Sequence, residues 1–448
     1  MLVKDPRKKT IRTSQYQQKS LVGNYRWMIV TLLFFATTIN YLDRQVIGLL
    51  KDYLAADLNW SERDYSNVVM AFSAAYALGL LLFGRFIDTI GTKLGYAVSI
   101  IIWSLAAMGH ALARTTLGFG IARTVLGLGE AGNFPAAIKS VAEWFPKKER
   151  AFATGIFNAG SNIAAVIGPF LIMWIFENYG WHEAFLWTGV IGFVWLIFWW
   201  ALYEVPAKQK RLGQAEFDYI HSDAPDMASA GSEKKISWGK IISVRQTWAF
   251  VVGKFLTDPI WWFYLFWIPS YFNTTYNLNL SSSWIYVSTI YVIASFGSVL
   301  GGYLSGWFIK NGWPVYKARK TAMLIYALCV VPVIFIQFTS NAWTAVLLIS
   351  LAAGAHQAWS ANIFTTASDM FPKTAVSSVV GIGGMAGSIG GILFPLLIGV
   401  ILDHFKSLEN INAGYNIIFI ICGCAYVIAW LLMHVLAPKM EQVKVGIE

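Results

Sequence analysis

The chain has 448 residues, of which 56% are hydrophobic and only 13% are charged, and 21 residues are tryptophan. A soluble domain does not need so large an apolar fraction, so the composition excludes a soluble globular protein and indicates a protein that crosses a membrane several times. The formal net charge of +10 would suggest nucleic-acid binding in a soluble chain, but the uneven placement of Lys and Arg between the loops accounts for it better, and we expect no nucleic-acid partner.

Apolar stretches near the roughly 20 residues that span a bilayer as an α-helix recur along the chain. They predict an all-α membrane protein with twelve transmembrane helices in two six-helix bundles. The expected spans are 27–50, 65–86, 94–113, 116–143, 152–176, 184–203, 248–273, 284–309, 319–340, 342–369, 376–402 and 413–437. The expected organisation is a cytoplasmic N-terminal segment (1–26), a first bundle (27–203), a cytoplasmic linker (204–247), a second bundle (248–437) and a cytoplasmic tail (438–448).

The positively charged residues indicate the orientation of the chain. If the N-terminus lies inside, the inner segments contain 26 of the 34 Lys and Arg residues and the outer loops contain four. Because cytoplasmic loops carry an excess of Lys and Arg, we expect both termini in the cytoplasm of a multi-pass protein of the cell membrane. The polar, basic N-terminal segment has no apolar core and does not resemble a cleaved signal peptide.

The first span holds two adjacent charged residues, Asp43 and Arg44, and the apolar run continues past them to Leu50. A charge in the hydrocarbon core is costly unless it is paired or hydrated, so such residues are functional candidates by default. Neighbours on a helix point about 100° apart, so one of the two can face a central cavity while the other faces a neighbouring helix. A structural ion pair that joins helices is the alternative.

The segment after the second span reads Gly84-Arg-Phe-Ile-Asp88-Thr-Ile-Gly91-Thr-Lys93. It resembles the loop signature of the major facilitator superfamily, and we expect Gly84, Asp88, Gly91 and Lys93 to form a gating loop. The glycines allow a tight turn, and Asp88 can accept hydrogen bonds from a helix N-terminus or pair with a nearby cation. Such a latch would stabilise one access state; an ordinary polar turn is the alternative.

The fourth span carries Arg123 and Glu130, which are two helical turns apart and therefore share one face, about 10 Å apart along the axis. Together with Asp43 and Arg44 they are expected to bring two arginines and two carboxylates to one cavity. This arrangement suits the binding of an organic anion coupled to the cycling of a proton. Lys139, near the inner end of the same span, is expected to extend its ammonium to the membrane surface.

Other polar and aromatic residues of the spans are candidates for completing a substrate site. A sugar acid needs a cation for its carboxylate, hydrogen-bonding groups for its hydroxyls and an aromatic face for its C–H side. The candidates are Tyr41, Tyr76, Asn158, Ser161, His356, Gln357, Trp359 and Asn362. A role in helix packing is an equally good interpretation of each one.

The seventh span contains Lys254 and Asp258, four residues apart, followed by Pro259. Ions at positions i and i+4 can neutralise each other on one helix, so we interpret these two residues as a structural pair. Pro259 is expected to kink the span.

Two segments, 130–156 and 356–382, are related by a constant offset of 226 residues. The matching pairs include Glu143 with Asp369, Gly155 with Gly381 and, further along, Pro169 with Pro395. The charged Glu130, however, falls on His356. A duplicated membrane protein with such buried charge in one half is most simply a transporter whose coupling machinery lies in that half.

Four motifs resemble the anion:cation symporters of the major facilitator superfamily: N-Y-L-D-R at 40–44, G-E-A-G-N-F-P-A-A-I-K at 129–139, V-A-E-W-F-P-K-K-E-R at 141–150 and F-N-A-G-S-N at 157–162. Within that group the chain resembles bacterial hexuronate transporters, with further support from K-F-L-T-D-P-I-W-W-F-Y-L-F-W at 254–267. The resemblance implies proton-driven import of a sugar acid such as glucuronate or galacturonate by alternating access. It also implies that Arg44 engages the carboxylate. Asp43 and Glu130 would then be protonatable sites, and Arg123 would be the charge partner on the fourth helix.

Two other transport functions stay open: import of another organic anion, such as a galactonate-like aldonate, and exchange of organophosphates, although buried Asp43 and Glu130 favour proton coupling. An intramembrane enzyme is not expected, because the six histidines form no metal-ligand spacing and no serine nucleophile motif is present. We therefore expect no catalytic residue, no metal and no cofactor. The expected partners are a small organic anion, protons and the lipid bilayer, and the expected oligomeric state is a monomer.

Overall fold

The computed structural model describes residues 23–223, 236–278 and 280–443, without the side chains of Glu62, Phe266 and 280–284. All regular secondary structure in these ranges is helical. Most of the predicted N-terminal segment, the middle of the predicted linker and the end of the predicted tail therefore lie outside the described residues.

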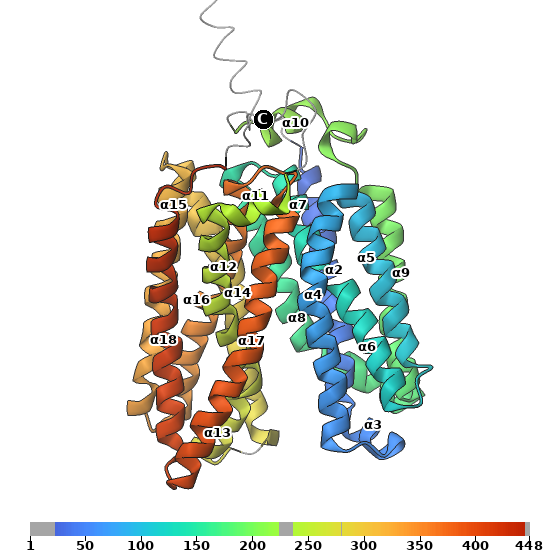
Figure 1. Ribbon diagram of the computed structural model, residues 1–448, viewed down its shortest axis with the longest axis vertical. Helices are drawn as coiled ribbons and strands as arrows, with labels where there is room; N and C mark the ends of the chain where they lie inside the picture. The colour runs from blue at the N-terminus through green and yellow to red at the C-terminus, as the bar shows by residue number, and fades with distance from the viewer. Residues whose placement is uncertain (1–22, 224–235, 279, 444–448) are drawn as a thin grey trace, which may run out of the picture.

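The helices before the linker lie together on one side of the molecule (Figure 1). They are α2 (Tyr25–Leu49), α3 (Lys51–Leu58), α4 (Glu62–Ile90), α5 (Thr92–His110), α6 (Thr116–Glu130), α7 (Asn133–Trp144), α8 (Lys147–Tyr179) and α9 (Trp181–Leu202). We call this set the N-half.

The helices after the linker lie on the other side and form the C-half (Figure 1). They are α12 (Arg245–Phe266), α13 (Ile268–Tyr276), α14 (Leu280–Lys310), α15 (Val315–Val330) with the 3₁₀ helix η2 (Val331–Phe338), α16 (Ala342–Met370), α17 (Val376–Ser407) and α18 (Ile411–Leu436). Between the halves the chain forms η1 (Pro206–Lys208), α10 (Gln214–Ile220) and α11 (Trp238–Ser243). We call the end of the molecule that carries α10 and α11 the linker end; α3 and α13 lie at the opposite end.

Three predicted spans are interrupted. The span predicted at 116–143 is two helices, α6 and α7, separated at Ala131 and Gly132. The span predicted at 248–273 breaks at Trp267, because Pro269 in the first turn of α13 has no N–H to continue the hydrogen bonding of α12. Pro259, where we expected the kink, lies inside the continuous helix α12. The span predicted at 319–340 ends in η2.

In the part of the chain that the structure describes, eight helical segments are long and apolar enough to cross a membrane by length and composition: α4, α5, α8, α9, α14, α15 with η2, α17 and α18. The other four long segments are α2, α6 with α7, α12 with α13, and α16. They carry the interior polar residues, which include Arg44, Glu130, Lys254 and His356. These four segments are therefore less apolar because they supply the polar interior, and the twelve segments together match the predicted number of spans.

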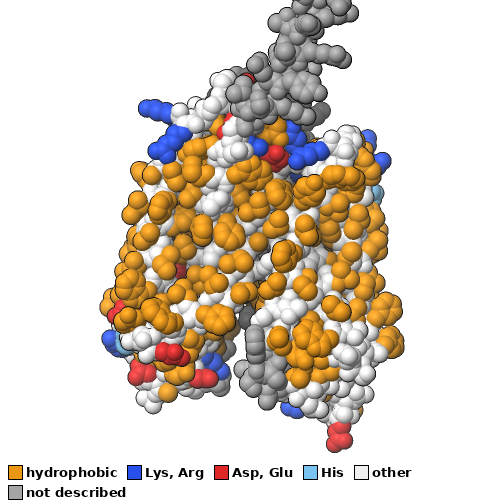
Figure 2. Space-filling model, turned by 180° about the vertical axis from the view of Figure 1, so that it is seen from behind, with side chains coloured by type: hydrophobic (Ala, Val, Ile, Leu, Met, Phe, Trp, Pro, Cys, Tyr) orange, Lys and Arg blue, Asp and Glu red, His pale blue; other side chains and the backbone are white. Residues whose placement is uncertain are grey.

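The outer surface agrees with a membrane location. A broad middle zone is covered by hydrophobic side chains, and charged side chains gather towards the two ends (Figure 2). Large apolar side chains that are exposed include Phe170, Trp200, Phe296 and Leu396. Such a band matches the hydrocarbon core of a bilayer, so the protein is a multi-pass membrane protein.

The two halves contact each other mainly where α4 meets α17 and where α8 meets α14. Glycines allow close backbone approach at both places. A Cβ atom on Gly381 of α17 would collide with the carbonyl oxygen of Leu80 in α4, and one on Gly155 of α8 would collide with that of Ser298 in α14. We call these contacts the α4/α17 crossing and the α8/α14 crossing; the two glycines are equivalent positions of the sequence repeat.

The linker helix α10 belongs structurally to the N-half. The carboxylate of Glu216 accepts hydrogen bonds from the backbone N–H groups of Tyr25 and Arg26, both at 3.1 Å, and so caps the start of α2. The Arg26 guanidinium also pairs with Glu216 and with Glu149 at the start of α8, each at 3.0 Å. The linker therefore begins with a docked segment rather than a free tether.

Candidate functional site

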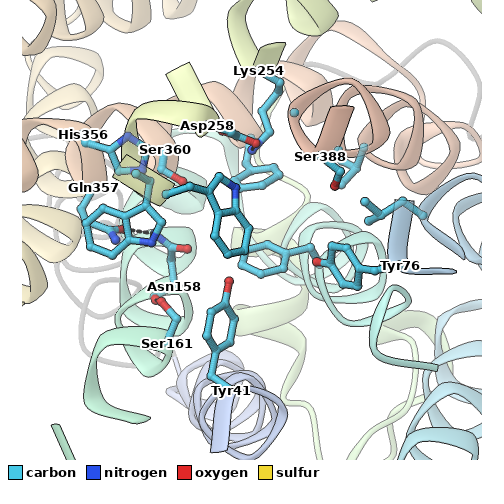
Figure 3. A pocket seen from close by; sticks show the side chains of 18 of the residues that line it. Tyr41, Tyr76, Asn158, Ser161, Lys254, Asp258, His356, Gln357, Ser360 and Ser388 are labelled. Carbon is cyan, nitrogen blue, oxygen red and sulfur yellow. Dashed lines mark hydrogen bonds and ion pairs between the residues drawn. The ribbon is translucent and has the colours of Figure 1, made fainter. Parts of the chain in front are cut away.

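A cavity lies between the halves and receives side chains from both (Figure 3). Its wall in the N-half is made by Tyr41, Arg44, Tyr76, Leu80, Phe134, Asn158 and Ser161. Its wall in the C-half is made by Lys254, Asp258, Trp261, Trp262, His356, Gln357, Ser360, Phe364, Val380, Gly384, Gly387 and Ser388. The mixed aromatic and polar lining suits a small polar ligand.

Arg44 is the cation of the N-half wall. Its Nε and Nη2 atoms donate to Oε2 of Glu130 at 3.0 and 2.8 Å, and its guanidinium lies over the rings of Tyr41 and Tyr76, with 4.8 and 4.6 Å to the centroids. The Arg44 side chain is 14% exposed whereas that of Glu130 is completely buried. The Arg44 guanidinium therefore faces the cavity, and the Glu130 carboxylate that balances its charge is buried in the N-half behind it.

Asp43, Arg123 and Glu130 do not line the cavity, contrary to the expectation that two arginines and two carboxylates converge on it. Asp43 is 2% exposed, and neither of its carboxylate oxygens has a hydrogen-bond partner among the described residues. Arg123, equally buried, donates from Nη2 to the backbone carbonyl of Arg44 at 3.3 Å. For Asp43 the reason is helical geometry: it lies two residues after Tyr41 and one before Arg44 on α2, so its side chain points away from theirs.

The predicted residues of the tenth span divide into two sets. His356 and Gln357 line the cavity, with Ser360 and Phe364 on the same face of α16. Trp359 and Asn362 do not. Trp359 is fully buried with its ring edge-on to Tyr426 at 5.5 Å, and Asn362 donates to the carbonyls of Gly301 and Ala358. These two residues serve helix packing, and Asn362, at 100° per residue, points to the side of α16 opposite the cavity.

Asn158 and Ser161 of α8 line the cavity as expected from their position on the fifth span. The Asn158 amide donates to Oε1 of Gln357 at 2.7 Å and to the hydroxyl of Ser298 at 3.2 Å, both in the C-half. A direct hydrogen bond between two predicted site residues thus joins the halves at the cavity wall.

Lys254 and Asp258 form an ion pair, with 2.7 Å between Nζ and Oδ2, as their spacing predicts. Our interpretation of them as only structural missed that both also line the cavity, together with Trp261 and Trp262 (Figure 3). The signal was present in the sequence: positions 254, 258, 261 and 262 form one stripe on a helix. Trp261 stacks on His356, with 5.1 Å between the ring centroids, which adds an aromatic wall.

Contacts between the halves close the cavity on the linker-end side. The ring of Phe134 in the N-half stacks on that of Phe364 in the C-half, with 5.2 Å between the ring centroids. On α4 and α17, contacts that join the halves lie nearer the linker end than the cavity-lining residues: Asp88 lies eight residues beyond Leu80 on α4, and its partner Ser377 lies seven before Gly384 on α17. At the opposite end the halves diverge and are divided by a notch (Figure 2).

Asp88 does both things expected of it. Its carboxylate accepts hydrogen bonds from the N–H groups of Ser377 and Ser378 in the first turn of α17, at 3.3 and 2.7 Å, and from the Ser378 hydroxyl at 2.7 Å. It also pairs with Lys139 at 2.9 Å. Lys139 is thus buried against Asp88 and does not reach the membrane surface, because a carboxylate within range offsets the cost of its burial.

The predicted gating loop is not a loop. Gly84 and Asp88 lie in the last turns of α4, and only Gly91, at φ 92°, separates α4 from α5. Gly84 packs against the backbone of Ser377 at the α4/α17 crossing. It therefore contacts the same turn of α17 as Asp88. Lys93, in α5, pairs instead with Glu204, two residues after the end of α9, at 3.0 Å.

The α8/α14 crossing is closed by arginines. Arg319 of α15 is fully buried and donates to Oδ2 of Asp369 at 3.0 Å, to the Ser305 hydroxyl at 2.6 Å and to the carbonyl of Lys147 at 2.7 Å. Arg150 of α8 donates to the carbonyl of Ser368 at 2.8 Å and reaches Asp369 at 3.4 Å. Neither arginine is among the residues predicted for a site, although Asp369 was recognisable as the repeat partner of Glu143.

Comparisons with known proteins agree with this architecture. Residues 33–395 match the family model described as Major Facilitator Superfamily. The chain is 33% identical over 403 residues to a hexuronate transporter of Escherichia coli K12, covering 89% of this chain and 93% of that protein. It is 34% identical over 289 residues to a galacturonate transporter of Dickeya chrysanthemi, covering 64% and 84%.

A solved structure of a proton:xylose symporter has the same fold, with a TM-score of 0.73 at 16% identity, covering 93% of this chain and 97% of that one. The twelve helical segments, the cavity between two halves and the match of the family model over most of the chain lead to one conclusion. The protein belongs to the major facilitator superfamily, and it is accordingly a membrane transporter and not an enzyme.

Proposed function

We propose that the protein is a proton-coupled symporter that imports a sugar acid, a hexuronate such as glucuronate or galacturonate, by alternating access. The observation that carries the proposal is Arg44: a guanidinium on the cavity wall, framed by the rings of Tyr41 and Tyr76 and balanced by the buried Glu130. A guanidinium can bind a carboxylate through two parallel hydrogen bonds. The names of the two relatives, a hexuronate and a galacturonate transporter, support the same substrate class.

Proton coupling follows from competition for Arg44. A substrate carboxylate that binds the guanidinium replaces Oε2 of Glu130, and the other oxygen of Glu130 already lacks a hydrogen-bond partner among the described residues. A fully buried carboxylate without a cation is costly, so substrate binding favours a proton on Glu130. Asp43, buried beside Arg44 without hydrogen-bond partners in the described chain, is the second proposed protonation site. Arg123 supplies positive charge behind both.

We also propose how the protein is oriented in the membrane and which access state the structure represents. The linker end lies in the cytoplasm, since 26 of the 34 Lys and Arg residues fall in segments assigned to that side. The closed contacts at the linker end and the notch at the other then correspond to a cavity accessible from outside the cell. The two bundles, 27–203 and 248–437, move against each other about this cavity, Gly84 and Asp88 latch the outward state, and the protein works as a monomer in the cell membrane.

Uptake into proteoliposomes tests the proposal. Labelled glucuronate, galacturonate, galactonate and a hexose phosphate are offered with and without an inward proton gradient. We expect gradient-driven accumulation of the hexuronates. Exchange of hexose phosphate without net uptake under a gradient would instead indicate an organophosphate antiporter, and preference for galactonate would indicate an aldonate transporter.

Variants test the assigned roles. Arg44→Ala should abolish binding, because the substrate carboxylate loses its charged partner in a low-dielectric cavity. Glu130→Gln should lose gradient-driven accumulation yet retain counterflow, which needs no proton movement. Glu143→Gln is the matched control, because its carboxylate contacts Thr92 and Tyr203 away from the cavity. Normal accumulation by Glu130→Gln would assign coupling to another group.

A further inference from the structure

Among the described residues, two ion pairs lie at the cavity wall, one in each half, and their more exposed members carry opposite charges. In the N-half pair the exposed member is the cation: Arg44 is 14% exposed and Glu130 is fully buried. In the C-half pair the exposed member is the anion: the Asp258 side chain is 22% exposed and that of Lys254 is 5% exposed. The cavity therefore has a positive wall at Arg44 and a negative wall at Asp258.

Lys254 lines the cavity, but its ammonium is already paired and is not available to bind a ligand. Its ammonium is 2.7 Å from Oδ2 of Asp258 and 4.0 Å from the ring centroid of Phe364, so a carboxylate and an aromatic face already surround it. Asp258, in contrast, has no polar partner among the described residues apart from this pairing. An exposed carboxylate oxygen with free lone pairs calls for hydrogen-bond donors from the ligand.

The surroundings of Asp258 suit a sugar rather than a second acid group. Ser360, Ser388 and the ring of His356 add neutral hydrogen-bonding groups on the same wall, and Trp261 and Trp262 add aromatic faces. Hydroxyl groups donate to a carboxylate in charge-assisted hydrogen bonds, while the C–H side of a sugar packs on aromatic rings. A second carboxylate placed there would face a like charge in a low-dielectric site.

We propose that Asp258 is the hydroxyl-binding and specificity-determining residue of the cavity, so that the transporter selects sugar acids with one carboxylate over those with two. The inference rests on the proposed function. It fixes how the substrate lies: the carboxylate is on Arg44 in the N-half and the hydroxyls are on Asp258 in the C-half. The ligand then bridges the two halves.

Gly387 makes room for this carboxylate. A Cβ atom at position 387 of α17 would collide with Oδ2 of Asp258. Gly387→Ala therefore displaces the Asp258 carboxylate without changing any charge. A matched control lies on the same helix, because a Cβ atom at Gly399 meets nothing within 4 Å.

The test is competition for labelled glucuronate uptake by unlabelled glucuronate and by glucarate, its counterpart with two carboxylates. The measured quantity is the ratio of the two half-inhibitory concentrations, which a general loss of folded protein does not change. In the unmodified protein glucarate should be weaker by roughly tenfold or more, from the loss of one or two charge-assisted hydrogen bonds and the added repulsion.

In Asp258→Asn the ratio should narrow at least about fivefold, because a neutral amide neither repels the second carboxylate nor binds hydroxyls as strongly. Since Asp258→Asn leaves the buried Lys254 unpaired, the double variant Lys254→Met with Asp258→Asn is measured as well and should show the same narrowing. Gly387→Ala should also narrow the ratio, and Gly399→Ala should leave it unchanged.

The outcomes separate the two proposals. If the unmodified protein takes up glucuronate but binds glucarate equally well or better, the role of Asp258 is overturned while sugar-acid transport stands. The same holds if the ratio stays constant in both Asp258 variants. If the unmodified protein takes up no sugar acid, both proposals are overturned.

Discussion

The α4/α17 and α8/α14 crossings share their packing but differ in their charges. In both, a glycine at an equivalent repeat position, Gly381 or Gly155, brings two backbones together. At the α4/α17 crossing a carboxylate of the N-half, Asp88, caps the start of a C-half helix. At the α8/α14 crossing arginines, including Arg319, bind backbone carbonyls and Asp369. The duplicated sequence thus kept the close contact of the helices, while each copy acquired its own means of holding it.

This comparison has a physical consequence. A carboxylate at a helix N-terminus is favoured by the helix dipole and by free N–H groups, and it can be released into water when the halves separate. A fully buried arginine with three acceptors loses far more when it is exposed or unpaired. We therefore expect the α8/α14 crossing to contribute chiefly to stability and the α4/α17 crossing chiefly to the balance of states.

Arg319→Met should have the largest effect. It leaves Asp369 buried with only Arg150, at 3.4 Å, so we expect a loss of about 3–5 kcal/mol and a clear fall in the melting temperature of the purified protein. Adding Asp369→Asn removes the unbalanced charge and should recover part of the loss. An unchanged melting temperature in Arg319→Met would show that this crossing does not depend on the ion pair.

Asp88→Asn should shift the equilibrium between access states by about 1.5–3 kcal/mol, because charge-assisted hydrogen bonds to α17 are lost. Lys139 can then extend along its long stem towards water, so the fold should survive. A cysteine introduced at Ser388, on the cavity wall, reports the shift through faster labelling from the linker-end side. Labelling rates equal to those of the unmodified protein would reduce Asp88 to a packing residue.

Gly381→Ala and Gly155→Ala test whether the two crossings depend equally on close backbone packing. Each added methyl group meets a backbone carbonyl that cannot move aside cheaply, so each should cost about 1–3 kcal/mol in closing the linker end. Uptake and the same labelling assay measure the effect. Gly399→Ala, in open space on α17, serves again as the control, and a much larger effect at one crossing than at the other would contradict equivalent packing.

Glu216→Gln should have the smallest effect, about 0.5–2 kcal/mol from the weakened cap on α2. Its hydrogen-bond partners, Tyr25 and Arg26, both belong to the N-half. The melting temperature should therefore fall slightly while the labelling rates stay constant. A change in labelling would mean that α10 takes part in the movement between the halves.

The amino-acid sequence by itself determined the helices and their number, because spans of about 20 apolar residues have one stable form in a bilayer. It also determined the repeat, the i,i+4 pairing of Lys254 with Asp258 and the ability of Asp88 to bind a helix N-terminus. These features depend on composition and on local spacing, which are written directly in the chain. Arg44, adjacent to Asp43 inside an apolar run, was visible as a candidate for the same reason.

Only the tertiary structure decided which face of each helix meets the cavity and which distant partner each buried ion finds. In the folded protein Trp359 and Asn362 pack against neighbouring helices rather than lining the cavity. Lys139 is paired with Asp88, and both Lys254 and Asp258 lie on the cavity wall. Helical periodicity gives the relative directions of side chains on one helix, but the rotation of that helix is set by its neighbours. A buried charge takes the nearest compatible partner, and that distance exists only after the helices have packed.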